Sequence, residues 1–181
     1  MWAAAAVVAS GAFAQQAPPA GPGWTGLTHP EDVILARQEL MIEAERLMRP
    51  IDSFTAGEAA DESDLRSAAE TIHHIMLAVP HLFPPPTNRH DPTAAEPVTL
   101  ALPAIWQDFA AFYALATAAS HAATTLAGSS DAAALVADGR ALRAACDGCH
   151  APFLRPYVPA QITEEDLEFD FDSIFEGSAE E

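Results

Sequence analysis

The apolar residues of this chain recur at helical spacing in four separate stretches. In the first, from about Pro30 to Arg49, successive side chains are spaced alternately by three and four residues, so they share one face of a helix. These are Ile34, Arg37, Met41, Ala44 and Met48. We expect Pro50 to end this helix, because the residue before a proline disfavours the helical region. The second stretch, from about Asp61 to Val79, carries a similar stripe and is followed by Pro80.

A proline-rich segment separates these two stretches from the other two. Residues 80–103 contain seven prolines, a density that excludes a regular helix and predicts a long crossover connection. We expect the third helix to begin near Pro103 or Ala104 and to run unbroken through a heptad-like seam: Ile105, Phe109, Phe112, Ala116, Ala119, Ala123 and Leu126. We expect the fourth to begin at Ser129 or Ser130 and to end by Pro156, with the seam Leu135, Gly139, Leu142, Cys146, Cys149 and Phe153.

Four amphipathic helices with one long connection predict an all-α protein, an antiparallel four-helix bundle over residues 28–157. The composition agrees, since half of the residues are apolar and alanine dominates among them. Alanine favours helices, whereas strands need more Val, Ile and Thr.

The first 27 residues have the character of an export signal and a linker. An apolar run at 2–9 is followed by Ala12-Phe13-Ala14, an A-x-A cleavage signature. The run is too short to span a bilayer. We therefore expect residues 1–14 to be a signal peptide, residues 15–27 to be a Pro/Gly-rich linker, and the mature protein to be periplasmic, without a membrane span after cleavage.

The charge of the chain is strongly acidic. Its 26 acidic residues against 8 basic ones give a formal net charge of −18, which argues against binding to nucleic acid or to an anionic membrane surface. Nine of the acids lie in residues 158–181, without a single base. We expect this tail to be disordered or loosely docked, and any protein partner to present a basic surface.

The sequence CDGCH contains both cysteines of the chain, Cys146 and Cys149, directly followed by His150. A thioredoxin-like dithiol needs its cysteines at the start of a helix, where the helix dipole lowers the thiol pKa, but here they lie near a helix end. A zinc site needs four ligands, usually as two separated pairs, and no second pair exists. A disulfide between these helical positions has poor geometry.

Covalent haem is the reading that this motif favours, because C-x-x-C-H is the attachment signature of c-type haem. Residues i and i+3 share one helical face, so both sulfurs can reach the vinyl groups of one porphyrin. His150 projects from the same side, and its imidazole can ligate the iron. We predict one covalently bound haem c, held by Cys146 and Cys149 with His150 as axial ligand. Zinc and a reactive dithiol are the remaining readings.

Three segments together resemble the cytochrome c prime family of four-helix bundles: PEDVILARQELM (30–41), PAIWQDFAAF (103–112) and CDGCH. The resemblance covers about residues 28–157. It implies that the haem is attached to the last helix and that the first helix crosses its distal face. It also implies that Arg37 lies near the haem propionates, that Met41 faces the open side of the iron, and that the chain can form a homodimer through its first two helices.

Met41 has three possible roles. As a ligand, its thioether gives His/Met iron with a raised reduction potential, suited to electron transfer. As a plug, it leaves the iron five-coordinate and open to small gases such as NO. As a core residue, it only packs, which methionine does well. We expect ligation, and hence a periplasmic cytochrome that exchanges single electrons with redox partner proteins and is not an enzyme. Gas binding is the alternative.

Overall fold

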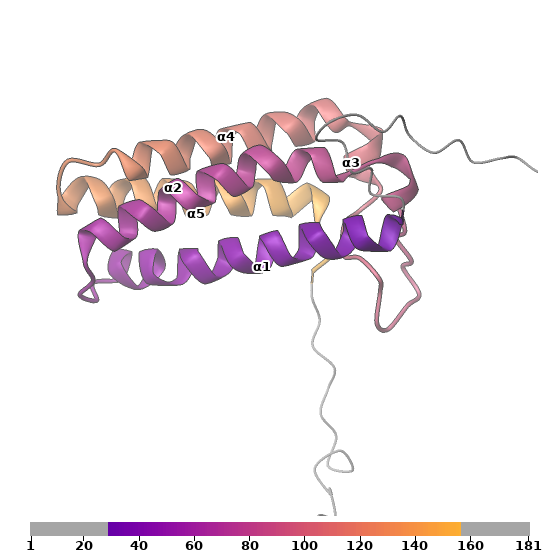
Figure 1. Cartoon of the computed structure of the whole chain (residues 1–181), viewed down its shortest axis with the longest axis horizontal. Coiled ribbons are helices and arrows are strands. Elements are labelled where there is room, and N and C mark those ends of the chain that lie inside the picture. The colour runs from indigo at the N-terminus through magenta and orange to yellow at the C-terminus, as the bar shows by residue number, and fades with distance from the viewer. Residues whose placement is uncertain (1–28, 157–181) are drawn as a thin grey trace, which may run out of the picture.

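The structure, a computed structural model, describes residues 29–156 of the chain. Four long helices lie side by side and alternate in direction (Figure 1). They are α1 (Pro30–Thr55), α2 (Glu62–Ala78), α4 (Phe109–Ala127) and α5 (Ala132–Phe153). Within the described residues there is no strand, only an isolated bridge between Ala101 and Leu154. The prediction of an all-α four-helix bundle is confirmed.

The expected signal peptide (1–14), linker (15–27) and acidic tail (158–181) lie outside the described residues. None of the helices within residues 29–156 combines the length and the apolar character that a membrane crossing requires.

Three of the helices begin at an aspartate whose carboxylate accepts a backbone N–H of the first turn, an arrangement that satisfies donors left free at a helix start. Asp61 accepts from the N–H of Ser63, Asp108 from Ala111 and Asp131 from Ala134. Between the helices, the core contains the apolar seams that the spacing predicted, among them Ile72, Ala123, Leu126, Leu135 and Leu142.

The expected end of the first helix at Pro50 is wrong, because α1 continues through Pro50 to Thr55. Proline inside a helix costs about 3 kcal/mol, since it lacks the N–H and crowds the preceding turn. Pro50 lies on the exposed side of the helix, whereas the next residue, Ile51, is only 1% exposed. Burying an isoleucine is worth about 1.5–3 kcal/mol, so packing of this last turn largely offsets the cost of the proline.

The expectation of one unbroken third helix is also wrong. A short helix, α3 (Ala104–Gln107), ends at Asp108, and α4 begins directly after it. Asp108 leaves the helical region (φ −135°, ψ 70°) in order to cap α4. The break changes the register of the seam, so that Ile105 and Phe112 are buried but Phe109 is 42% exposed.

Residues 80–103, here called the crossover segment, connect α2 to α3 as predicted. The segment contains only short 3₁₀ turns, η1 (Val79–Leu82, which begins just before it) and η2 (Pro85–Thr87). Its last part is bonded to the end of α5: the N–H of Leu102 donates to the carbonyl of Phe153 (2.9 Å), and the N–H of Arg155 donates to that of Leu100 (2.8 Å). The crossover segment therefore lies at the same end of the bundle as the CDGCH motif.

Candidate functional site

A cavity of about 460 Å³ lies between α1, α2, α4, α5 and the crossover segment. Its walls are mainly apolar side chains, including Val79, Phe83, Leu100, Ala101, Ile105, Phe112, Ala116 and Phe153. All five residues that the sequence singled out also line it: Arg37, Met41, Cys146, Cys149 and His150. The bundle thus brings the two ends of the predicted site, on α1 and α5, to one cavity.

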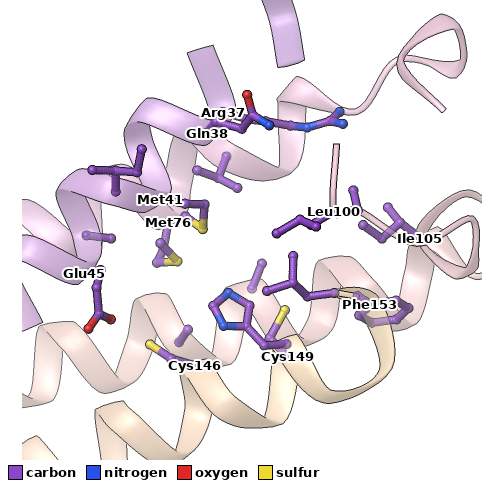
Figure 2. Close-up of a pocket in the computed structure, with 18 of the residues that line it drawn as sticks. Arg37, Gln38, Met41, Glu45, Met76, Leu100, Ile105, Cys146, Cys149 and Phe153 are labelled. Carbon is purple, nitrogen blue, oxygen red and sulfur yellow. The ribbon is translucent and has the colours of Figure 1, made fainter. Parts of the chain in front are cut away.

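The CDGCH residues line the cavity from α5. Both thiols are free and partly buried, and His150, which is more exposed, lies at the margin. Figure 2 shows Cys146 and Cys149 on the side of α5 that faces Met41 and Met76 across the cavity. Two thiols one turn apart with an imidazole beside them are the donor set that a covalently attached haem requires.

Burial raises the pKa of both thiols, that of Cys149 to about 11. The thiols are therefore protonated at neutral pH, whereas a catalytic dithiol needs a thiolate. Within residues 29–156, no three His, Cys, Asp or Glu side chains form a group that could bind a metal ion. Neither the dithiol reading nor the zinc reading gains support from this environment.

Methionine thioethers face the CDGCH motif from the other side of the cavity. Met41 of α1 is partly buried and lines the cavity (Figure 2). Met76 of α2 lies beside it and is almost fully buried. Met48 lines the same cavity seven residues further along α1. Met76 was not singled out from the sequence, since periodicity does not distinguish a cavity wall from the core.

Arg37 is the only charged residue of α1 that is buried, with 3% of its surface exposed. Its two terminal nitrogens donate four hydrogen bonds to three residues of the crossover segment, Leu82, Thr87 and Thr99. The Nε–H group has no acceptor among the described residues. Burial lowers the pKa of Arg37 to about 10, so the side chain is still charged at neutral pH, and it forms no ion pair with a described carboxylate.

A second arginine joins α1 to α5 at the edge of the cavity. The guanidinium of Arg143 pairs with Asp52 and, at 3.1 Å, with Glu45. The hydrogen bonds that Arg143 donates to the Asp52 carboxylate raise the pKa of Arg143. Unlike that of Arg37, the charge of Arg143 is thus already matched by two carboxylates.

The other histidines of residues 29–156 lie outside this cavity. His73, for example, lies between α2 and α4, where its Nδ1 is 2.8 Å from the hydroxyl of Ser120. His150 is the histidine that lines the cavity.

The residues of the cavity fit a c-type haem. The two thiols and the imidazole match its attachment and axial ligation, and the apolar walls match its macrocycle. The charge of Arg37, which lacks a carboxylate partner among residues 29–156, matches the negative charge of a propionate.

A family model described as Cytochrome C' matches residues 32–154 of the chain. Comparison with curated protein sequences gave no significant match. Among solved structures, cytochrome c′ from Rhodopseudomonas palustris is 29% identical over 70% of this chain and 98% of its own length, with a TM-score of 0.62. A cytochrome c′ described as having an unusual ligand-controlled dimer dissociation is 25% identical over 72% of this chain and 99% of its own length, with a TM-score of 0.63. The fold is also shared by a mutant cytochrome c prime from Alcaligenes xylosoxidans in complex with nitric oxide. It is 21% identical over 72% of this chain and 100% of its own length, with a TM-score of 0.61.

Proposed function

Since the chain belongs to the cytochrome c′ family, whose cofactor is covalently attached haem c, we propose that it is a one-electron carrier with a single haem. In this proposal Cys146 and Cys149 would form the thioether bonds, and His150 and Met41 would ligate the iron. The observation that supports it most directly is the position of Met41, whose side chain lines the cavity opposite the CDGCH helix.

The haem supplies an iron that alternates between the ferric and the ferrous state, and His/Met ligation raises its potential. The chain contributes the surroundings. Its apolar walls exclude water, which disfavours the more highly charged ferric state. Arg37 offers its charge to a propionate, with Nε–H as the donor that no described residue uses. We propose a carrier and not an enzyme.

The sequence and the exposed side chains of α1 support a location, partners and an oligomeric state for this carrier. The A-x-A signature at residues 12–14 and the extracytoplasmic attachment of haem c favour a periplasmic location. The net charge of −18 favours redox partners with a basic surface. A homodimer through α1 and α2 is supported by two apolar side chains that α1 exposes at i and i+7, Leu35 and Ile42, and by the dimer behaviour of a related structure.

Gas binding is the second candidate function, and Met41 decides between it and electron transfer. Met41 is partly exposed, while Met76 beside it is buried in the core. A flexible thioether at a cavity margin can act as a plug that a small neutral molecule such as NO displaces. The iron is then five-coordinate in the resting protein.

Optical spectra of the holoprotein in both oxidation states separate these functions. If Met41 is a ligand, the ferric protein is low-spin and shows the long-wavelength methionine–iron charge-transfer band. Met41→Leu, which conserves volume, then makes the iron high-spin and opens it to CO and NO. Met48→Leu is the matched control, because Met48 lines the same cavity, and it keeps the wild-type spectrum. A wild-type protein that is already high-spin contradicts ligation and favours gas binding.

A further inference from the structure

One side chain, Arg37, connects α1 to both arms of the crossover segment. Its Nη1 donates to the Thr87 hydroxyl at 2.9 Å and to the carbonyl of Leu82 at 3.2 Å. Its Nη2 donates to the Thr99 hydroxyl at 2.9 Å and to the carbonyl of Thr87 at 3.4 Å. The partners belong to the beginning and to the end of the segment, so this guanidinium joins the two arms as well as attaching both to α1.

The two threonines are placed for this contact. Thr87 and Thr99 are 0% and 2% exposed, and each hydroxyl has a second partner within the segment. The hydroxyl of Thr87 donates to the carbonyl of Pro84 (2.8 Å), and that of Thr99 accepts the N–H of Ala101 (3.2 Å). Loss of the guanidinium would therefore leave buried acceptors without their charged donor, which costs more than loss of an exposed hydrogen bond.

Two aromatic rings surround the guanidinium. Its carbon lies 4.6 Å from the ring centroid of Phe83 and 5.8 Å from that of Trp106, distances at which a cation is attracted to an aromatic face. The indole N–H of Trp106 donates to the carbonyl of Phe83 (3.0 Å), so the two rings are fixed relative to each other. The described groups that contact the Arg37 guanidinium are all neutral. Its positive charge therefore lies in the cavity wall without a paired carboxylate among residues 29–156.

We propose that Arg37 is a positioning residue with two separable roles at the haem cavity. Its hydrogen bonds stabilise the crossover segment as the end wall of the cavity, which Phe83, Leu100 and Ala101 line. Its charge raises the reduction potential of the haem, because a nearby cation in low-dielectric surroundings favours the less positive ferrous state. The second role rests on the proposed function, whereas the first does not.

Tryptic cleavage of the holoprotein after Arg89 measures the first role. Arg89 is exposed within the crossover segment, and cleavage there requires the segment to open. The Thr87→Val/Thr99→Val double variant removes the two hydrogen bonds that these hydroxyls accept from Arg37, together with their bonds to Pro84 and Ala101, and keeps the charge. We expect cleavage at least about tenfold faster. Thr93→Val, the same change at an exposed position of the segment, should alter the rate by no more than about twofold.

The reduction potential measures the second role. Arg37→Gln removes the charge, and we expect both faster cleavage and a potential lower by about 59 mV or more, which is a tenfold change for one electron. Arg37→Lys keeps the charge but not the forked hydrogen bonds, so it should restore the potential and not the resistance to trypsin. The double threonine variant should likewise keep the potential. Arg46→Gln is the control for loss of an exposed charge on α1 and should change neither quantity.

Each role can fail independently. Unchanged cleavage in both the double threonine variant and Arg37→Lys overturns the stabilising role. An unchanged potential in Arg37→Gln, or in Arg37→Met if the first variant does not fold, overturns the electrostatic role. Failure of the electron-transfer proposal is recognised separately, from a high-spin ferric spectrum of the wild-type protein.

Discussion

Replacing Gly139 by alanine tests how closely α1 and α5 approach each other. Gly139 lies inside α5, where a Cβ atom would be 2.8 Å from Cγ2 of Thr55 and 3.0 Å from Cγ2 of Ile51. Carbon atoms in contact prefer about 3.5–4.0 Å, so the added methyl group is about 0.5–1 Å too close to both. These contacts exist only because α1 continues past Pro50.

Two opposing effects decide the sign of the change. Alanine gains about 1 kcal/mol over glycine in a helix interior, whereas overpacking a well-packed site costs about 1–3 kcal/mol. Both neighbouring side chains are held in place: Ile51 is 1% exposed, and the hydroxyl of Thr55 donates to the carbonyl of Asp52 at 2.9 Å. We therefore expect Gly139→Ala to destabilise the protein by about 1–2 kcal/mol, lowering its melting temperature by about 2–8 °C.

Gly148→Ala is the matched control, because Gly148 lies in the same helix and an added Cβ there meets nothing within 4 Å. It should leave stability unchanged or raise it by up to about 1 kcal/mol. Guanidinium unfolding of the two holoproteins, followed by circular dichroism, measures both differences. If Gly139→Ala is as stable as Gly148→Ala, the close approach of α1 and α5 is refuted.

Two further predictions concern the α5 helix. Replacing Cys146 and Cys149 together by serine should abolish haem staining of the denatured protein, whereas either single replacement should leave a haem with one thioether bond; staining retained by the double variant would contradict covalent attachment. Asp131→Ala should lower the melting temperature at neutral pH, because the carboxylate accepts the N–H of Ala134. That hydrogen bond holds the pKa of Asp131 below its usual 3.8, so the stabilisation is complete above pH 3.8 and disappears as the pH falls through the lower folded value. A difference between the two proteins that stays constant down to pH 2 would contradict this role.

The places where the expectations from sequence were wrong have a common physical origin. Pro50 is a local signal for a helix end, yet burial of Ile51 against another helix offsets its cost. Ala104–Leu126 has the spacing of a continuous helix, yet Asp108 breaks it and turns Phe109 outward. In both cases the local preference is worth only a few kcal/mol, and tertiary contacts of similar size oppose it.

The sequence by itself determined the four helices, the long crossover and the side of the last helix that carries Cys146, Cys149 and His150. These features depend on residues three or four positions apart, which a helix brings together wherever it forms. Only the tertiary structure decided what surrounds that motif: Met76 beside Met41, and the contacts of Arg37 with Thr87 and Thr99. The latter join residues 50 and 62 positions apart, and no periodicity encodes such pairs, because they depend on how the helices and the crossover segment pack.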